Sequence, residues 1–78
     1  MHKYLIVESW VDGKQCVFKC HNARYHVARV LSGMPPPGVT LSGAKPHLGF
    51  GLLSAPTGAT YRVHFESINE TRLPSVSA

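Results

Sequence analysis

An Asp-Gly pair, Asp12-Gly13, constrains this chain more than any other feature. It separates two apolar runs, YLIVESWV at 4–11 and KQCVFKC at 14–20. Asp-Gly between alternating apolar segments is the strongest short-range signal for a β-hairpin, because both central residues of a type I′ turn need a positive φ. The sequence therefore predicts an N-terminal hairpin with a two-residue loop.

This loop also predicts the register of the hairpin, with Glu8 opposite Val17, Val7 opposite Phe18 and Leu5 opposite Cys20. Because side chains alternate between the two faces of a strand, the register assigns each residue to a face. The expected core face holds Leu5, Val7, Val11, Cys16, Phe18 and Cys20. The other face holds Tyr4, Ile6, Trp10 and Val17 among Glu8, Gln15 and Lys19. A chain of 78 residues has little material to cover both faces, so the second face is a candidate contact surface.

The segment after the hairpin has the spacing of an amphipathic helix. Asn22 is a suitable N-cap and Gly33 a suitable C′ residue, so we expect a helix over 23–32. Its apolar stripe consists of Ala23, Val27, Val30, Leu31 and Met34. Tyr25, Arg29 and Ser32 lie on the opposite side, flanked by Arg24. The prolines at 35–37 cannot continue a helix and predict an extended exit.

The rest of the chain predicts further strands. Residues 38–42 fit a short strand, while 45–55 fits either a strand with a bulge or an ordered loop. The run 59–67 alternates Tyr61, Val63 and Phe65 inward with polar side chains outward, which is typical of a half-buried strand. We expect one domain over 1–73 and a frayed tail over 74–78. The predicted fold class is α+β, a small antiparallel sheet packed by one helix.

Metal and catalytic chemistry are poorly supported by the sequence. Cys16, Cys20, His21 and His26 lie close together along the chain, but Cys16 and Cys20 stand about 13 Å apart on a strand, too far for one zinc ion. Neighbouring Cys20 and His21 point to opposite faces, and His64 is expected to face away from the cysteines. The four carboxylates are not clustered, and the Gly-rich stretch at 49–51 lacks the remainder of a phosphate-binding motif. We expect no cofactor, no metal and no enzymatic activity.

Charge and hydropathy limit the partners and the cellular compartment that we expect for this chain. The net charge of +4 permits contact with an acidic partner or nucleic acid without requiring it. Neither a signal peptide nor an apolar run long enough to span a membrane is visible, so we expect a cytoplasmic protein without membrane contact. In that compartment two cysteines are expected to be free thiols.

Two binding hypotheses follow, one for a protein partner and one for nucleic acid. Tyr, Trp and Arg are the side chains that most often dominate protein interfaces, and a second subunit is an alternative cover for the apolar sheet face. A helix face with Arg24, Tyr25 and Arg29, aided by Lys19 and Arg62, would instead contact phosphates, with aromatic rings stacking on bases.

The layout of the first forty residues resembles small phage-encoded host-takeover proteins, among them anti-CRISPR proteins. The resemblance rests on Tyr4-Leu5-Ile6-Val7, the Asp12-Gly13 turn and the Asn22-capped helix. It implies an inhibitor that covers a functional surface of a host protein or nucleoprotein complex, in the host cytoplasm. Many such inhibitors are acidic mimics of nucleic acid, whereas this chain is basic, so an acidic or RNA-bearing surface is the expected target.

The sequence thus predicts a non-enzymatic binding protein of the phage or mobile-element type, with a small basic nucleic-acid-binding module as the alternative. The residues expected to carry the contact are Tyr4, Ile6, Trp10, Lys19, Arg24, Tyr25, Arg29 and Arg62.

Overall fold

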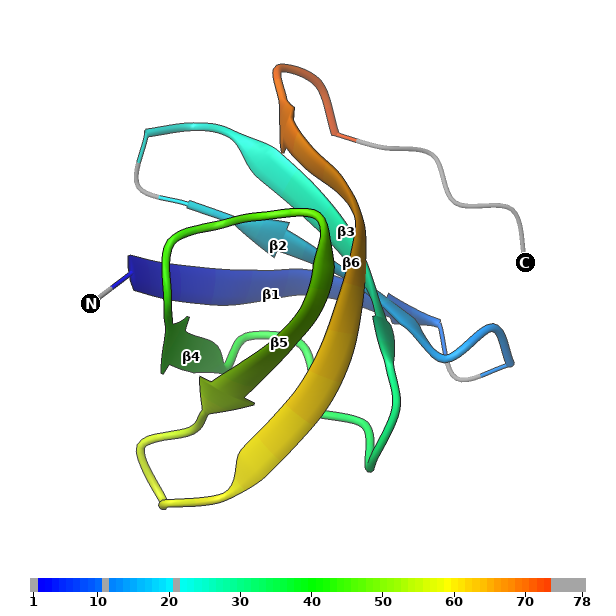
Figure 1. Ribbon diagram of the computed structural model, residues 1–78, viewed down its shortest axis with the longest axis vertical. Helices are drawn as coiled ribbons and strands as arrows, with labels where there is room; N and C mark the ends of the chain where they lie inside the picture. Colours follow the sequence, from blue (N-terminus) through cyan, green and yellow to red (C-terminus); the bar gives the residue numbers. More distant parts are fainter. Residues whose placement is uncertain (1, 11, 21, 74–78) are drawn as a thin grey trace.

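A computed structural model describes residues 2–10, 12–20 and 22–73. Its regular elements in these ranges are all strands, which form one closed antiparallel barrel (Figure 1). The strands are β1 (His2–Trp10), β2 (Gln15–Lys19), β3 (Tyr25–Val30), β4 (Thr40–Gly43), β5 (Gly49–Ser54) and β6 (Thr60–Glu70). The predicted α+β class is therefore wrong.

The barrel consists of two antiparallel meanders, β1-β2-β3 and β4-β5-β6. Their edges pair with each other, β3 with β6 and β1 with β4, so the order around the barrel is β1-β2-β3-β6-β5-β4. Closure leaves none of the six strands as a free edge. β6 and β5 consequently lie across the barrel from β1 and β2.

The β1–β2 hairpin confirms the predicted register only near its turn. Trp10 pairs with Gln15, and Glu8 with Val17, as expected. The turn itself differs, because Gly13 lacks a positive φ and the left-handed residue is Lys14, with φ 52°. Four residues therefore separate the strands, the loop length that is most often built around a type I turn.

A β-bulge between Ile6 and Glu8 breaks the predicted register farther from the turn. Beyond it Ile6 pairs with Phe18 and Leu5 with Lys19, instead of Val7 with Phe18 and Leu5 with Cys20. One extra residue on one strand moves every later side chain to the opposite face. The bulge therefore exchanges the two faces of the first half of β1.

Tyr4 and Ile6, predicted to form a contact surface, are accordingly buried in the barrel, and that prediction is wrong. Leu5, predicted to be in the core, is 38% exposed, and Val7 is half-buried. Cys16, Phe18 and Cys20 are in the core as predicted, and Val11 lies outside the described residues. Val17 is buried, although it is not part of the core cluster.

The predicted helix over 23–32 is strand β3 and the turn before it. His26, Ala28 and Val30 are buried and alternate with Tyr25 and Arg29, so the period is two. The buried His26 interrupts the apolar pattern in the sequence. Val27 and Val30 have the spacing of a helical stripe, but on β3 they lie on opposite faces, with Val30 in the core cluster and Val27 buried outside it. β-branched and aromatic side chains favour the strand once β2 and β6 offer pairing on both sides.

The predicted helix caps have other roles in the structure. The Asn22 Oδ1 accepts a hydrogen bond from the Arg24 N–H at 3.2 Å, but the resulting turn joins β2 to β3. Gly33 has the positive φ expected of a C′ residue, 72°, yet it follows a strand. Asn and Gly favour these local conformations wherever the chain turns, so they mark a turn without identifying the element beside it.

The proline segment at 35–37 connects the two meanders. It leads to Gly38 and Val39, whose backbone groups bond to both the carbonyl and the N–H of Ile6 at 2.8 and 3.0 Å. The chain thus meets β1 next to the bulge and continues into β4. The segments whose structure the sequence left open form β4 and β5, and the predicted strand over 59–67 is confirmed as part of β6.

The core of the barrel is aromatic at its centre. The Tyr4 ring lies 5.8 Å from Phe18, 5.7 Å from Phe65 and 5.8 Å from the His26 ring, measured between centroids. Tyr4 donates its hydroxyl hydrogen to the Ala44 carbonyl, and burial raises its pKa to about 12. Rings from β1, β2, β3 and β6 therefore pack against one another inside the barrel.

Because of the bulge, we expect substitutions of two neighbouring residues of β1 to reduce stability by very different amounts. Ile6→Ala removes a side chain that is 1% exposed, and we expect a loss of about 2–5 kcal/mol in the free energy of unfolding. Leu5→Ala is the matched control and should cost about 0.5 kcal/mol. Denaturant unfolding of both variants measures the difference. A larger loss for Leu5→Ala would contradict the observed register.

Candidate functional site

Arg29 and Arg62, two of the predicted contact residues, lie on the adjacent strands β3 and β6, and Trp10 lies two strands from Arg29 on β1. Trp10 ends β1 and is half-buried, whereas Arg29 on β3 and Arg62 on β6 are exposed. They come from strands that the sequence analysis did not connect, because the predicted helix separated them. The β3–β6 pairing brings Arg29 and Arg62 near each other.

A single cross-strand row joins this group to β5. Trp10 pairs with Gln15, Gln15 with Arg29, Arg29 with His64, and His64 with Phe50. Directly opposite residues share a face, so all five side chains are on the outer surface. We call Trp10, Gln15, Arg29, His64 and Phe50 the outer belt. It spans four inter-strand spacings of about 4.8 Å each.

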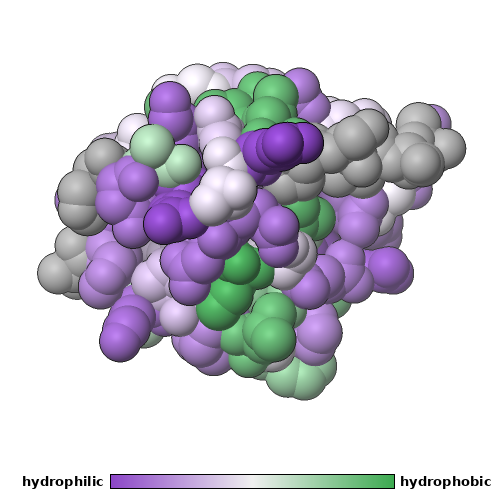
Figure 2. Space-filling view, turned by 90° about the horizontal axis from the view of Figure 1, so that it is seen from above, coloured by the Kyte–Doolittle hydropathy of each residue, from purple (hydrophilic) through white to green (hydrophobic). Residues whose placement is uncertain are grey.

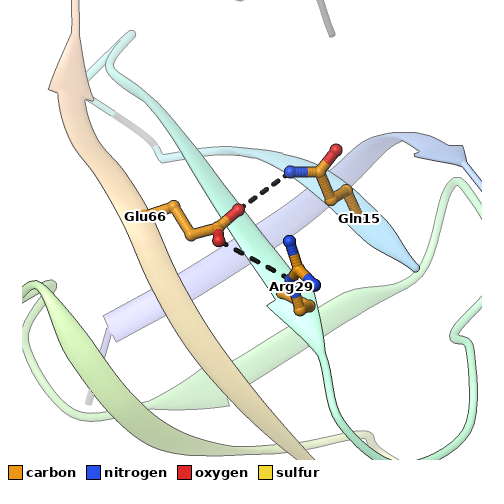
Figure 3. Close-up of polar contacts among 3 residues, drawn as sticks. All are labelled: Gln15, Arg29 and Glu66. Atoms are coloured by element: carbon orange, nitrogen blue, oxygen red, sulfur yellow. Dashed lines mark hydrogen bonds and ion pairs between the residues drawn. The ribbon is translucent and has the colours of Figure 1, made fainter. Parts of the chain in front are cut away.

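The centre of the outer belt is held by Glu66. Its carboxylate accepts a hydrogen bond from Gln15 Nε2 at 2.8 Å and pairs with Arg29 Nε at 3.6 Å (Figure 3). Figure 3 shows the three side chains converging from β2, β3 and β6. The interaction is solvent-exposed and contributes little to stability, but it restrains the Arg29 guanidinium on the surface.

The β5 end of the belt is apolar. Phe50 is 73% exposed and Leu52 is 56% exposed, and the neighbouring Leu31 is 46% exposed. These three line a groove of about 440 Å³ together with Arg62. We call Leu31, Phe50 and Leu52 the apolar patch. Figure 2 shows groups of hydrophobic side chains on the surface, set among hydrophilic ones.

Strand β5 points Phe50 and Leu52 outward, and Gly51 and Leu53 inward. Gly51 faces the core, where an added Cβ would lie 3.3 Å from the Phe65 ring. The glycine thus makes room for the aromatic core, and the alternation then places Phe50 and Leu52 outside. The sequence signal was the Gly-Phe-Gly-Leu run at 49–52. Its alternation is visible in the sequence, but the sequence does not show which of the two sets of residues faces the core.

His47 restrains the loop that leads into β5. Its Nδ1 lies 3.0 Å from the Lys45 carbonyl and its Nε2 lies 2.8 Å from the Phe50 carbonyl. Both partners are acceptors, so both contacts are hydrogen bonds only when the ring carries two protons. These backbone hydrogen bonds raise the pKa of His47. The protonated ring therefore ties the loop to the residue that forms the apolar end of the belt.

A thiol–imidazole pair lies inside the barrel. Cys20 Sγ is 2.9 Å from His26 Nε2, and the Asn69 N–H donates to His26 Nδ1 at 3.0 Å. The Nδ1 atom therefore carries no proton, the neutral ring is protonated at Nε2, and Nε2 donates to the sulfur. Burial lowers the pKa of His26, helped by repulsion from His2, and burial raises the pKa of Cys20.

This arrangement does not activate the thiol. A general base for Cys20 would need a free lone pair at Nε2, but that atom already holds the proton. The other cysteine, Cys16, is buried with its sulfur 3.6 Å from Met34 Sδ and 3.6 Å from Ser9 Oγ. Burial raises the pKa of Cys16, although the hydrogen bond with Ser9 opposes this. Both sulfurs are therefore core groups.

In the described part of the chain, no three His, Cys, Asp or Glu side chains are arranged to hold a metal ion. His21, one of the residues considered for zinc, lies outside the described residues. The structure has no helix in those ranges that is long and apolar enough to cross a membrane.

The remaining predicted contact residues, Lys19, Arg24 and Tyr25, gather at the β2–β3 turn. Lys19 and Tyr25 are cross-strand partners, and the Lys19 ammonium lies 5.9 Å from the centre of the Tyr25 ring. Lys19 is four positions after Gln15 along β2, which corresponds to a distance of about 13 Å. These residues therefore form a second surface group, apart from the outer belt.

The two hydrogen-bonded histidines should titrate in opposite directions. We expect the pKa of His26 to lie below the ordinary value of about 6.5 and that of His47 above it, because burial disfavours the charged His26 ring and the His47 ring donates to two backbone carbonyls. A pH series of heteronuclear NMR spectra of the ring protons measures both. In urea the two pKa values should converge. A native His26 pKa above that of His47 would contradict the assigned hydrogen bonds.

The same shifts predict how stability responds to acid. The contribution of neutral His26 to the free energy of unfolding is complete above about pH 6.5. It falls as the pH drops, because the unfolded chain takes up the proton at a higher pH than the folded chain. The contribution of His47 has the opposite sign, complete below about pH 6.5 and lost as the pH rises through its raised pKa. His47→Gln should therefore lose more stability between pH 7.5 and pH 5 than the unmodified chain, measured by urea unfolding. An equal or smaller loss in the variant would contradict this.

Comparison with protein-family models, with curated proteins and with solved structures gives no match to this chain. Its function must therefore be inferred from the surface groups themselves.

Proposed function

We propose that this chain is a non-enzymatic binding protein that covers a surface of a larger protein through the outer belt and the apolar patch. The observation that carries the proposal is the orientation of β5, whose Phe50 and Leu52 are mostly exposed while Gly51 faces the core. Exposed contiguous apolar side chains on a small protein mark interaction sites.

The composition of the belt supports a protein partner. Trp10 and Arg29 belong to the residue types that most often dominate binding energy, and Phe50 adds an aromatic side chain at the opposite end. The Phe50 ring meets the His64 ring edge-on at 4.8 Å between centroids, which restrains it before any partner binds. A restrained aromatic side chain loses little conformational entropy on binding.

Absence of catalysis is part of the proposal and is supported by the thiol–imidazole pair. The proton at His26 Nε2 and the raised pKa of Cys20 leave this pair without a nucleophile at neutral pH. We also place the protein in the cytoplasm. Two buried free thiols fit a reducing compartment.

Inhibition of a host protein by a phage or mobile-element product is the narrower form of this proposal. The layout that suggested it included a helix, which the structure replaces with β3. Support for inhibition therefore comes from the apolar patch instead of from a helix, because an inhibitor that covers a functional surface needs an exposed apolar contact face. A homodimer that uses the same patch is the competing explanation.

Phe50→Ser should remove binding without unfolding the chain, because the ring is mostly outside the core. We expect a loss of at least about 2 kcal/mol, or about 30-fold in affinity, for an aromatic anchor. The matched control is Leu73→Ser, an exposed leucine beyond β6. Affinity capture from nuclease-treated lysate of the source cells, quantified by mass spectrometry, compares the three proteins.

The expected result is a set of proteins captured by the unmodified chain and by Leu73→Ser, and lost with Phe50→Ser. Light scattering of the purified chain should give the mass of a monomer. Capture that Phe50→Ser leaves unchanged would reject the assigned surface. A dimer that Phe50→Ser dissociates would replace the proposal with self-association.

A further inference from the structure

A second cross-strand row crosses the outside of the barrel near the β2–β3 turn. Tyr25 pairs with Lys19, Lys19 with Leu5, and Leu5 with Thr40, so β3, β2, β1 and β4 each contribute one side chain. Lys3, two residues before Leu5, is the diagonal neighbour of Lys19, with Cα atoms about 7–8 Å apart. We call Lys3, Lys19, Arg24 and Tyr25 the basic row.

Two hollows adjoin the basic row and meet at Cys20. One, of about 400 Å³, lies between Lys3, Leu5 and Lys19. The other, of about 210 Å³, is lined by His2, Asn22, Lys45 and Asn69 among others. Among the residues that the structure describes, no acidic side chain lines either hollow.

The cations of this surface are available to a ligand. The ion pair formed among the described residues engages Arg29, which belongs to the outer belt. The Lys3 ammonium donates to Ser42 Oγ at 2.8 Å, a neutral partner. Glu70 is the cross-strand partner of Tyr25, and its carboxylate accepts a hydrogen bond from Ser67 at 2.7 Å. Among the described residues, no carboxylate in the lining of the two hollows neutralises their positive charge.

The row also offers an aromatic and an apolar surface beside the cations. Lys19 lies over the Tyr25 ring, which restrains the ring at the surface. Leu5 is exposed between the two lysines. A positively charged groove with an aromatic platform is the combination that binds single-stranded nucleic acids, whose phosphates meet the cations while the bases stack on the ring.

We propose that the basic row binds the sugar–phosphate backbone of a single-stranded nucleic acid, with one base stacked on Tyr25. Lys3 and Lys19 contact neighbouring phosphates, and Lys45 extends the contact into the smaller hollow. Lys3 and Lys19 of this site are on β1 and β2, whereas Phe50 and Leu52 of the apolar patch are on β5. The basic row shares no residue with the outer belt or the apolar patch, so the two proposals are tested separately.

Fluorescence anisotropy with a labelled 20-nucleotide oligothymidine tests the proposal. With three to four phosphates engaged, we expect the logarithm of the binding constant to fall with the logarithm of salt concentration with a slope of about −2 to −3. The double variant Lys3→Glu/Lys19→Glu should weaken binding about ten-fold or more at low salt. Tyr25→Ala should weaken it with little change in the slope, because stacking releases no counterions.

The matched control is Lys14→Glu/Arg72→Glu, which alters two exposed side chains that belong to neither proposed binding surface. Both double variants lower the formal net charge from +4 to 0, but the control changes no residue of the basic row. Circular dichroism checks that both remain folded. The control should retain most of the affinity.

Four outcomes would overturn the proposal. They are the absence of binding at 50 mM salt, equal losses in the two double variants, a loss caused by Phe50→Ser, and equal competition by polyglutamate. Equal losses in the two double variants would indicate attraction by overall charge alone. A loss caused by Phe50→Ser would move the site to the apolar patch. Equal competition by polyglutamate would indicate an acidic protein surface as the ligand.

Discussion

Pairing of β1 with both β2 and β4 closes the barrel, and the bulge between Ile6 and Glu8 determines which side chains enter it. A bulge bends its strand and increases the local twist, which is what a strand needs in order to follow the wall of a small barrel. At the same point the chain from the proline segment bonds to Ile6 on its way into β4. The position of Tyr4 at the centre of the aromatic core follows from this one irregularity.

The sequence predicts local features of this fold better than its class. The register next to the turn and the inward side chains Val63 and Phe65 are correct, because they depend on alternation within a few residues. The extra residue at the bulge has no signal of its own, so the assignment of Tyr4 and Ile6 to the surface is wrong. The β3 segment carries apolar residues at both helical and strand spacing, and only the distant strand β6 decides between them.

His26 shows why a buried polar residue misleads a pattern analysis and still fits the core. Its ring is completely buried, yet both nitrogens have partners, the Asn69 N–H and the Cys20 sulfur. Pairing of both ring nitrogens removes much of the cost of burying a polar group. Asn69 has a positive φ of 57°, and its backbone N–H points at the ring. The end of β6 therefore contributes to fixing the protonation state of a residue on β3.

The outer surface carries side chains that the barrel does not need for folding. Gly51 is explained by the Phe65 ring that it accommodates, but no packing requirement accounts for Phe50 and Leu52 outside. A chain selected only for stability and solubility would place polar residues there. Likewise, in the part of the chain that the structure describes, no acidic side chain lines the two hollows beside the lysines of the basic row. The two proposed surfaces share no residue, so contact of the apolar patch with a protein would leave the basic row open to a nucleic acid. If both proposals hold, the chain would be suited to a nucleoprotein complex.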